Sequence, residues 1–235
     1  MLGSRPVKIA VVIPALCEAD RIQFAVHSAR APEVEVVVVD GGSRDATRER
    51  ARDAGARVLE CERGRARQLA EGVRATAAEA LVFLHADTRL PPGYAEAVRG
   101  ALADPAVAGG AFAFRFGPAP GAGPLVRLGL RLVEAGARLR VALLRLPYGD
   151  QALFARRAAL ERAGGVPQAP IMEDLDLLAA LRRVGRVALL PLAVTTSPRR
   201  YVEGGVVRTW ARNALALAGY YAGADRARLA AWYGR

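Results

Sequence analysis

The sequence predicts an α/β protein with a mostly parallel central sheet, because short apolar runs alternate with amphipathic segments along the first third of the chain. Three runs consist almost entirely of β-branched and aliphatic residues: Lys8–Pro14, Glu35–Asp40 and Ala80–Leu84. Continuous runs are typical of strands that helices cover on both faces, as in parallel sheets. Helical periodicity occupies the segments between and after them, at about Asp20–Arg30, Arg44–Ala54 and Arg65–Ala77. This order predicts a doubly wound, Rossmann-like layer with helices on both faces.

The remaining expected elements follow in chain order. Arg57–Cys61 is a short strand between the second and third helical segments. Val107–Phe116 alternates in character and carries two adjacent glycines, so we expect a bent or bulged strand. Gly117–Gly123 is a turn-rich loop. Pro124–Leu146 is expected to form a long helix, and Val206–Tyr233 is a second helical stretch that closes the chain.

Length and composition are those of one globular domain. The 235 residues are 52% hydrophobic and 24% charged, which excludes disordered and collagen-like chains. No internal repeat and no Pro/Ser/Gly-rich linker divides the chain. We therefore expect a single domain over residues 1–235, made of two halves at about 6–105 and 106–205 and closed by a helical segment at 206–235.

The charge balance is strongly basic, with 34 Lys and Arg against 23 Asp and Glu and a formal net charge of +11. Because Lys8 is the only lysine, the excess is arginine. This charge favours approach to any polyanion, whether nucleic acid, an acidic membrane face or a phosphorylated small molecule. The sequence contains no nucleic-acid recognition module, so no nucleic-acid partner is expected.

Cysteine content and hydropathy indicate the cellular compartment in which the protein is expected. Cys17 and Cys61 fit no metal spacing and no disulfide framework, which favours a reducing, cytoplasmic environment. No secretory signal is expected, and no apolar run approaches the roughly 20 residues of a membrane span. Pro124–Leu146 places leucines beside a stripe of arginines, which leaves open a peripheral contact with a membrane surface.

Ligands of open parallel sheets collect at the carboxyl ends of the strands, so the residues that follow each strand are the first candidates. The segment Asp40-Gly41-Gly42-Ser43 follows the second run. Its glycines allow close approach of the backbone to a ligand, and the Asp40 carboxylate can accept hydrogen bonds from a base or a ribose. The same residues fit equally well a turn that caps the following helix.

His85-Ala86-Asp87 follows the third run, and the i,i+2 spacing points His85 and Asp87 to the same side of an extended segment. Carboxylates at a sheet edge are typical ligands of Mg²⁺ or Mn²⁺, which they connect to substrate phosphates. The structural alternative is a strand-end histidine whose hydrogen bonds are made by the backbone, with Asp87 in a turn.

Three further polar clusters lie in the second half of the chain. Glu173-Asp174-Leu175-Asp176 places acidic residues at a helix start, where the helix dipole alone would favour them. Tyr148-Gly149-Asp150-Gln151 is a polar break before an apolar run. Arg199-Arg200 offers paired guanidinium groups that suit phosphate oxygens. The dinucleotide fingerprint GxGxxG, the phosphate loop GxxxxGK[ST] and the hydrolase elbow GxSxG are all absent.

Taken in order, these segments resemble a family 2 glycosyltransferase of the GT-A fold. The resemblance runs from about Lys8 to the C-terminus and is carried by VVIPALCEAD, VVVVDGGSRDAT, GRARQLAEGVRATAA, LVFLHADTRLP, GGAFAFRF, PYGDQALF, MEDLDL and VTTSPRRY. More narrowly, the chain resembles the bacterial subfamily of radical-SAM/selenodomain-associated transferases. Cys17 stands where asparagine is common, and the Q/RxxRW signature of processive synthases is absent, which favours a single transfer.

The resemblance implies a role for each matching residue. Those implied to bind the nucleotide-sugar donor are Pro14, Glu18, Asp40, Gly41, Arg65, Arg67, Gln68, Ala86, Arg199 and Arg200. Asp87 is implied as the ligand of Mg²⁺ or Mn²⁺, with His85 where most of the family has a further aspartate. Asp174 is implied as the catalytic base, with Glu173 and Asp150 as the less favoured alternatives.

The function implied by the resemblance is transfer of a sugar, with inversion, from a nucleotide-diphosphate donor such as a UDP- or GDP-sugar to an acceptor hydroxyl or phosphate. Residues 6–105 would bind the donor and residues 106–205 the acceptor. The sequence does not identify the acceptor and leaves a lipid-linked one open. The alternative is a peripheral membrane or nucleotide-sugar-binding protein with the same fold and no transferase activity.

Overall fold

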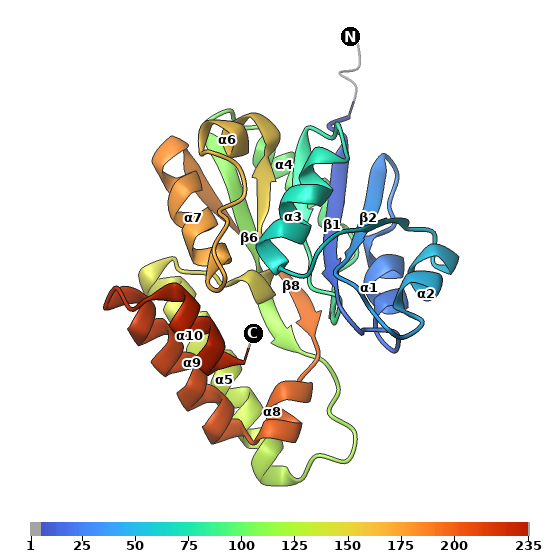
Figure 1. Cartoon of the computed structure of the whole chain (residues 1–235). Helices are drawn as coiled ribbons and strands as arrows, with labels where there is room; N and C mark the ends of the chain where they lie inside the picture. The colour runs from blue at the N-terminus through green and yellow to red at the C-terminus, as the bar shows by residue number, and fades with distance from the viewer. Residues whose placement is uncertain (1–5, 235) are drawn as a thin grey trace.

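The computed structural model describes residues 6–234, and its centre is an eight-stranded sheet in the order β3-β2-β1-β4-β7-β6-β8-β5 (Figure 1). The strands are β1 Ile9–Ala15, β2 Val34–Asp40, β3 Arg57–Glu60, β4 Ala80–Phe83, β5 Thr88–Arg89, β6 Val107–Phe116, β7 Phe154–Arg156 and β8 Arg186–Thr196. The first four strands pair in parallel, as do β6 and β8. Strand β7 is antiparallel to β4 and β6, and β5 is antiparallel to β8. The predicted α/β class is therefore confirmed, with antiparallel pairs added in the second half.

Helices cover both faces of this sheet. They are α1 Ile22–Ala29, α2 Thr47–Asp53, α3 Arg65–Arg74, α4 Tyr94–Leu102, α5 Pro124–Leu144, α6 Arg157–Arg162, α7 Glu173–Val184, α8 Arg199–Gly204, α9 Val206–Tyr221 and α10 Arg226–Tyr233. Strand β1 explains the continuous apolar runs, because its alternate residues enter two different cores. Ile9 and Val11 join the core under α1 and α4, whereas Ala10 and Val12 join the core under α3, α6 and α7.

Strand β6 is bulged, as predicted. Its register against β8 shifts between Val107 and Gly109 and again between Phe112 and Ala113. The adjacent glycines are needed for packing, since a Cβ on Gly109 would lie 2.3 Å from the Phe154 carbonyl oxygen and one on Gly110 2.3 Å from the Ala188 oxygen. The neighbouring strands thus approach β6 closely on both sides.

The helical stretch predicted over Val206–Tyr233 consists of two helices, α9 and α10. The chain leaves the helix after Tyr221, passes Gly223 with a φ of 75°, and starts α10 with Asp225, whose carboxylate accepts a hydrogen bond from the Arg228 N–H at 2.8 Å. The glycine supplies a left-handed conformation that a helix interior cannot contain, and Asp225 is a normal helix cap.

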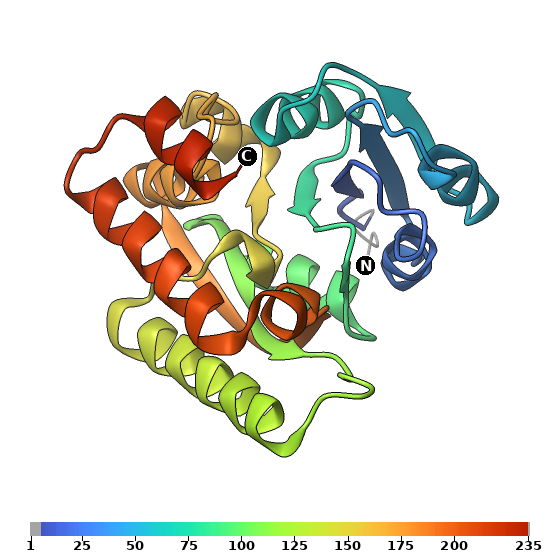
Figure 2. The same cartoon turned by 60° about the horizontal axis from the view of Figure 1, so that its bottom comes forward.

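Helices α5, α8, α9 and α10 gather below the sheet in Figure 1, at the end where the strands other than β5 and β7 have their carboxyl termini. Figure 2 shows α5 and α9 side by side on the outside of this helical group. Within residues 6–234, no helix combines the length and the apolar character that crossing a bilayer requires.

Candidate active site

A cavity of about 980 Å³, counted with its open mouth, lies between the sheet edge and the helical group. The sheet edge contributes residues that follow β4, end β6 and end β8, and α8, α9 and α10 form the opposite wall. Its charged lining residues are Arg65, His85, Asp87, Asp150, Asp174 and Arg200. Four rings, those of Phe116, Tyr148, Tyr201 and Tyr233, make up much of the rest. Six of the residues predicted from the sequence therefore meet in one place.

Asp174 stands on the first turn of α7 and is fixed by backbone donors. Its Oδ2 accepts a hydrogen bond from the Gly149 N–H at 2.6 Å, and its Oδ1 accepts one from the Leu175 N–H at 3.0 Å. Met172, immediately before the helix, has a φ of 61°, which turns the chain sharply into α7. The carboxylate is thus held at a helix N-terminus with its remaining lone pairs toward the cavity.

Each residue of the tripeptide Gly149-Asp150-Gln151 has a different structural role. A Cβ on Gly149 would lie 2.8 Å from Asp174 Oδ2 and 2.7 Å from Arg65 Nη2, so only glycine leaves room for both side chains. Gln151 is buried, and its Nε2 donates to the Phe112 carbonyl oxygen at 2.9 Å, which anchors the turn to β6. The tripeptide therefore presents Asp150 from a fixed backbone.

Asp150 is the electrostatically unusual group of the cavity. Its Oδ1 is buried and has no hydrogen-bond partner among the described residues. Burial raises the pKa of its carboxyl to about 6; the charges of Asp174 and Asp87 add to the rise, and Arg140 and Arg65 oppose it. A partly buried carboxyl with a pKa near neutrality, in a cavity with two other carboxylates, is typical of an acid–base site.

Arg65 connects the start of α7 to the segment that follows β4. Its Nε forms an ion pair with Glu173 Oε1 at 3.0 Å, and its Nη2 contacts Nε2 of His85. Glu173 is buried and is not among the residues that line the main cavity. Of the acidic pair at the start of α7, Asp174 therefore faces the cavity, whereas Glu173 holds Arg65 in position.

Asp87 and His85 are the predicted metal ligands, and both line the cavity. The Asp87 carboxylate accepts a long hydrogen bond of 3.5 Å from the Thr88 hydroxyl, while its backbone oxygen accepts from the Ser197 N–H at 3.0 Å. Across residues 6–234, no preassembled group of three His, Cys, Asp or Glu side chains could hold a metal ion. A cation at Asp87 would thus depend on substrate oxygens for the rest of its coordination, as Mg²⁺ commonly does.

Asp40 is fully buried, and the loop that follows it uses both of its oxygens. Oδ1 accepts from the N–H groups of Gly42 at 3.0 Å and Ser43 at 2.8 Å, and Oδ2 accepts from the Ser43 hydroxyl. Ser43 in turn accepts from the Cys17 N–H at 2.8 Å. The structure thus shows the turn that the sequence analysis left open as the alternative, and Asp40 shapes the loop from within.

Gln68 has a similar internal role. Its side chain is buried, and Nε2 donates to the Ala15 oxygen at 2.9 Å and to the Val39 oxygen at 2.8 Å, which joins the ends of β1 and β2. Gly41 makes this possible, because a Cβ there would lie 3.1 Å from the Gln68 amide. These residues build the sheet edge and do not line the cavity.

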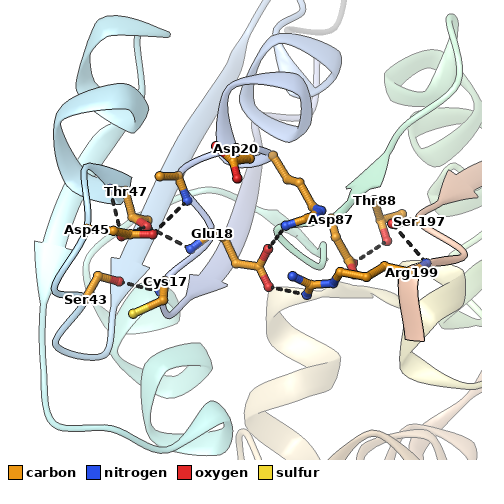
Figure 3. Close-up of polar contacts among 12 residues, drawn as sticks. Cys17, Glu18, Asp20, Ser43, Asp45, Thr47, Asp87, Thr88, Ser197 and Arg199 are labelled. Atoms are coloured by element: carbon orange, nitrogen blue, oxygen red, sulfur yellow. Dashed lines mark hydrogen bonds and ion pairs between the residues drawn. The ribbon is translucent and has the colours of Figure 1, made fainter. Parts of the chain in front are cut away.

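Figure 3 shows how the strand-end loops are joined to one another. Glu18 lies between two arginines: its Oε1 pairs with Arg199 at 3.0 Å and its Oε2 with Arg21 at 3.5 Å. The Glu18 N–H donates to the Thr47 hydroxyl at 2.8 Å. Arg199 therefore links the β1–α1 loop to the segment after β8, and Arg200 is the member of the arginine pair that faces the cavity.

The other predicted donor residues lie away from the cavity lining. Arg67 is exposed and pairs with Glu62 on the surface. Pro14 is within β1 beside Val39, and Ala86 is buried in the core under α1 and α4.

The wall formed by the C-terminal helices was not foreseen in the sequence. Asn213 of α9 donates to the Tyr201 hydroxyl at 3.1 Å and accepts from the Tyr233 hydroxyl at 2.6 Å, and the Tyr201 ring packs edge-on against Phe116 with centroids 5.1 Å apart. Asp176 fastens these helices to α7 by accepting from Tyr220 and from Arg226, each at 2.8 Å. No motif marks such a network, which depends on residues brought together from separate helices.

A cavity at the carboxyl ends of the strands, with three carboxylates and two arginines, defines an enzyme site for a charged polar substrate. The family model described as glycosyl transferase family 2 matches residues 10–164, well over half of the chain. The chain belongs to this family, and it is a glycosyltransferase with the GT-A fold. A search of curated proteins finds no match.

Solved structures of similar shape agree with this fold. One is glucosyl-3-phosphoglycerate synthase from Mycobacterium tuberculosis in complex with Mn²⁺, UDP-glucose and phosphoglyceric acid, with a TM-score of 0.64 and 24% identity, covering 93% of this chain and 81% of that chain. The same enzyme was solved with Mg²⁺ and UDP, at 24% identity and a TM-score of 0.64, covering 93% and 80%. Another is a mycobacterial protein with a TM-score of 0.60 and 25% identity, covering 89% and 74%.

Proposed function

We propose that the cavity transfers a sugar from a nucleotide-diphosphate donor to an acceptor hydroxyl or phosphate, with Mg²⁺ or Mn²⁺ as cofactor. The observation that carries this proposal is the convergence of Asp87, Asp150 and Asp174, from three separate segments, on one cavity flanked by Arg65 and Arg200. The similar synthase binds UDP-glucose with Mn²⁺, which supports a UDP-sugar as the first donor to test and a GDP-sugar as the second.

In the proposed reaction, the acceptor hydroxyl attacks the anomeric carbon while Asp174 takes its proton. The bond from that carbon to the diphosphate oxygen breaks, and the diphosphate leaves with the electron pair. Direct displacement inverts the anomeric configuration. A carboxylate base must come within about 3 Å of the proton it removes. Asp174 suits this role because its two backbone hydrogen bonds hold it at the cavity wall.

The charged groups around Asp174 would take the other roles. Asp87 and His85 would hold the cation, which when bound offsets negative charge on the leaving diphosphate. Their chemistry fits, since a carboxylate and an imidazole both ligate Mn²⁺ and the carboxylate suits Mg²⁺. Arg65 and Arg200 would add positive charge near the same oxygens. Asp150, whose Oδ1 is buried, would adjust the charge of the site with its protonation.

We propose that successive segments of the chain bind the donor and the acceptor. Residues 6–105 would bind the donor, 106–205 would bind the acceptor and 206–235 would close the acceptor side with Asn213 and the two tyrosines that it holds. The loop made by Asp40, Gly41 and Gln68 would support the nucleoside through its backbone shape. We place the protein in the cytoplasm, because Cys17 and Cys61 are unpaired thiols. The narrower subfamily resemblance stays a prediction.

Thermal melting against UDP-, GDP-, ADP- and TDP-sugars, with and without Mn²⁺, tests this function. A ligand at about 100 times its Kd adds roughly 2.7 kcal/mol to the free energy of unfolding, which raises Tm by several degrees. We expect a Mn²⁺-dependent rise with one nucleotide class. No rise with any donor would favour the alternative of a GT-A protein without transferase activity.

A further inference from the structure

The outside of α5 carries a row of leucines that no described residue covers. Leu125, Leu128, Leu132, Leu139 and Leu143 are 54% to 84% exposed. Their spacings of three, four and seven residues place them on one stripe of the helix. Exposed leucines are ordinary when scattered, whereas a contiguous apolar stripe marks a surface that meets another apolar phase.

Helix α9 presents a second apolar row beside the first. Val207, Trp210 and Tyr221 are 79%, 57% and 63% exposed. The two helices touch where Gly129 of α5 meets Val206 of α9, since a Cβ on Gly129 would lie 2.8 Å from Val206 Cγ1.

The positions of the contact residues show that the two rows join. Gly129 neighbours Leu125 and Leu132 on the surface of α5, and Val206 neighbours Trp210 on α9. Both rows therefore border the same joint between helices that lie side by side in Figure 2. The adjoining side of α9 carries Thr209, Asn213 and Leu217, which line the active-site cavity. The joined rows form one outward apolar face, here called the α5–α9 face.

Arginines border this face on both sides. Arg127, Arg131 and Arg138 form an exposed row on α5, on the side of the leucines away from α9, and Arg208 and Arg212 are exposed on α9. The only acidic residue in these two helices is Glu134, whose carboxylate accepts from the Phe116 N–H at 2.6 Å. The exposed charged side chains of these two helices are therefore all arginines.

We propose that the α5–α9 face docks on a lipid bilayer with anionic headgroups. The leucine row would enter the boundary between headgroups and acyl chains, Trp210 and Tyr221 would sit at the headgroup level, and the arginine rows would meet lipid phosphates. A second copy of the chain fits less well, because a symmetric contact through this face would bring the arginine rows together with no carboxylate between them. This binding goes beyond the transfer reaction and does not depend on it.

The two tryptophans of the protein provide the test. Trp210 lies on the face and Trp232 on α10 is 51% exposed, so W232F leaves Trp210 as the only reporter. The full-length W232F protein is mixed with vesicles of phosphatidylcholine alone or of phosphatidylcholine with phosphatidylglycerol, and emission and co-sedimentation are recorded at low and physiological salt. We expect a blue shift and co-sedimentation with the anionic vesicles only.

Paired variants separate docking on this face from general attraction of a basic protein. In the W232F background, L128Q/L132Q should weaken vesicle binding at least about tenfold by removing inserted side chains. R131Q/R138Q should weaken it about tenfold at low salt. The control R52Q/R74Q removes the same charge from exposed positions of α2 and α3 and should change binding less than about twofold.

Three outcomes would overturn the proposal. The first is no binding of the parent protein to anionic vesicles at low salt. The second is an equal loss of binding in R52Q/R74Q and R131Q/R138Q, which would mean adsorption through net charge. The third is a dimer in light scattering that L128Q/L132Q dissociates, which would assign the face to a second copy. Circular dichroism of each variant confirms that it is folded.

Discussion

The two halves of the molecule use their carboxylates in different ways. In the first half, Asp40 is buried and accepts three hydrogen bonds from its own loop. In the second half, Asp150 has a buried oxygen without a hydrogen-bond partner among residues 6–234, and its pKa rises to about 6 because of burial. The comparison indicates that the buried carboxylate of the first half is fully hydrogen-bonded and stabilises the fold. The second half instead keeps a reactive carboxyl group that reduces stability. Substitutions should therefore reduce stability in the first half and turnover in the second.

The largest effect is expected for D174N. Loss of the base should lower the rate of transfer by about 10² to 10⁴-fold. Asparagine keeps an oxygen that can accept from the Gly149 N–H, so the free energy of unfolding should change by less than about 1 kcal/mol. Initial rates and chemical denaturation measure both quantities. The control is D20N, which changes an exposed side chain that pairs with Arg50 on the surface. Full activity of D174N would mean that Asp150 or Glu173, and not Asp174, is the catalytic base.

The scaffold side of the comparison is tested by D40A. The substitution leaves two N–H groups and the Ser43 hydroxyl without their acceptor in a buried loop, so the free energy of unfolding should fall by about 3 kcal/mol. Urea denaturation measures the change. D45A is the matched control in the same loop, and because Asp45 is exposed, water replaces its hydrogen bonds and the loss should be about 1 kcal/mol or less. Equal losses would show that burial of Asp40 is unimportant.

The reactive side is tested by D150N and pH. A carboxyl whose pKa is raised from 3.8 to about 6 in the folded state binds its proton more tightly when folded, so the stability that it confers is complete below pH 4 and is lost as the pH rises to about 6. D150N should therefore stabilise the protein by up to about 3 kcal/mol at pH 8 and hardly at pH 4. Urea denaturation of D150N and the wild-type protein at both pH values, with EDTA present to remove metal ions, measures the difference in the free energy of unfolding. A difference that does not depend on pH would contradict the assigned pKa.

The sequence predicted the first half of the fold well because each strand there is an apolar run with its own helix. The second half was harder to predict. Strand β8, Arg186–Thr196, contains Pro191 and mixes polar with apolar residues, and β7 has only three residues, so neither carries a strong local pattern. Their places in the sheet come from pairing with β6, which is a long-range contact.

The residues of the candidate site also differ in how well the sequence predicted their positions. Asp87 was found after an apolar run, Asp174 at a helix start and Asp150 in a polar break before an apolar run, and the structure brings them together. Asp40 and Gln68 were predicted to touch the donor, yet they are buried and hydrogen-bonded within the scaffold. The same residue types suit both roles, and only burial and hydrogen-bond partners distinguish them. Of the two tyrosines held by Asn213, Tyr233 lies in no motif, and Tyr201 is only the last residue of VTTSPRRY.

The most direct test of a metal-dependent donor site is calorimetric titration with the nucleotide-sugar selected by melting, with and without Mn²⁺. The proposed roles predict that Mn²⁺ tightens donor binding to the wild-type protein and to D174N, whereas D87A binds the donor equally weakly in both conditions. Asp87 lines the same cavity as Asp174 without sharing its hydrogen bonds, so the two variants differ only in the role that each removes. An unchanged response to Mn²⁺ in D87A would contradict the assignment of the cation to this cavity edge.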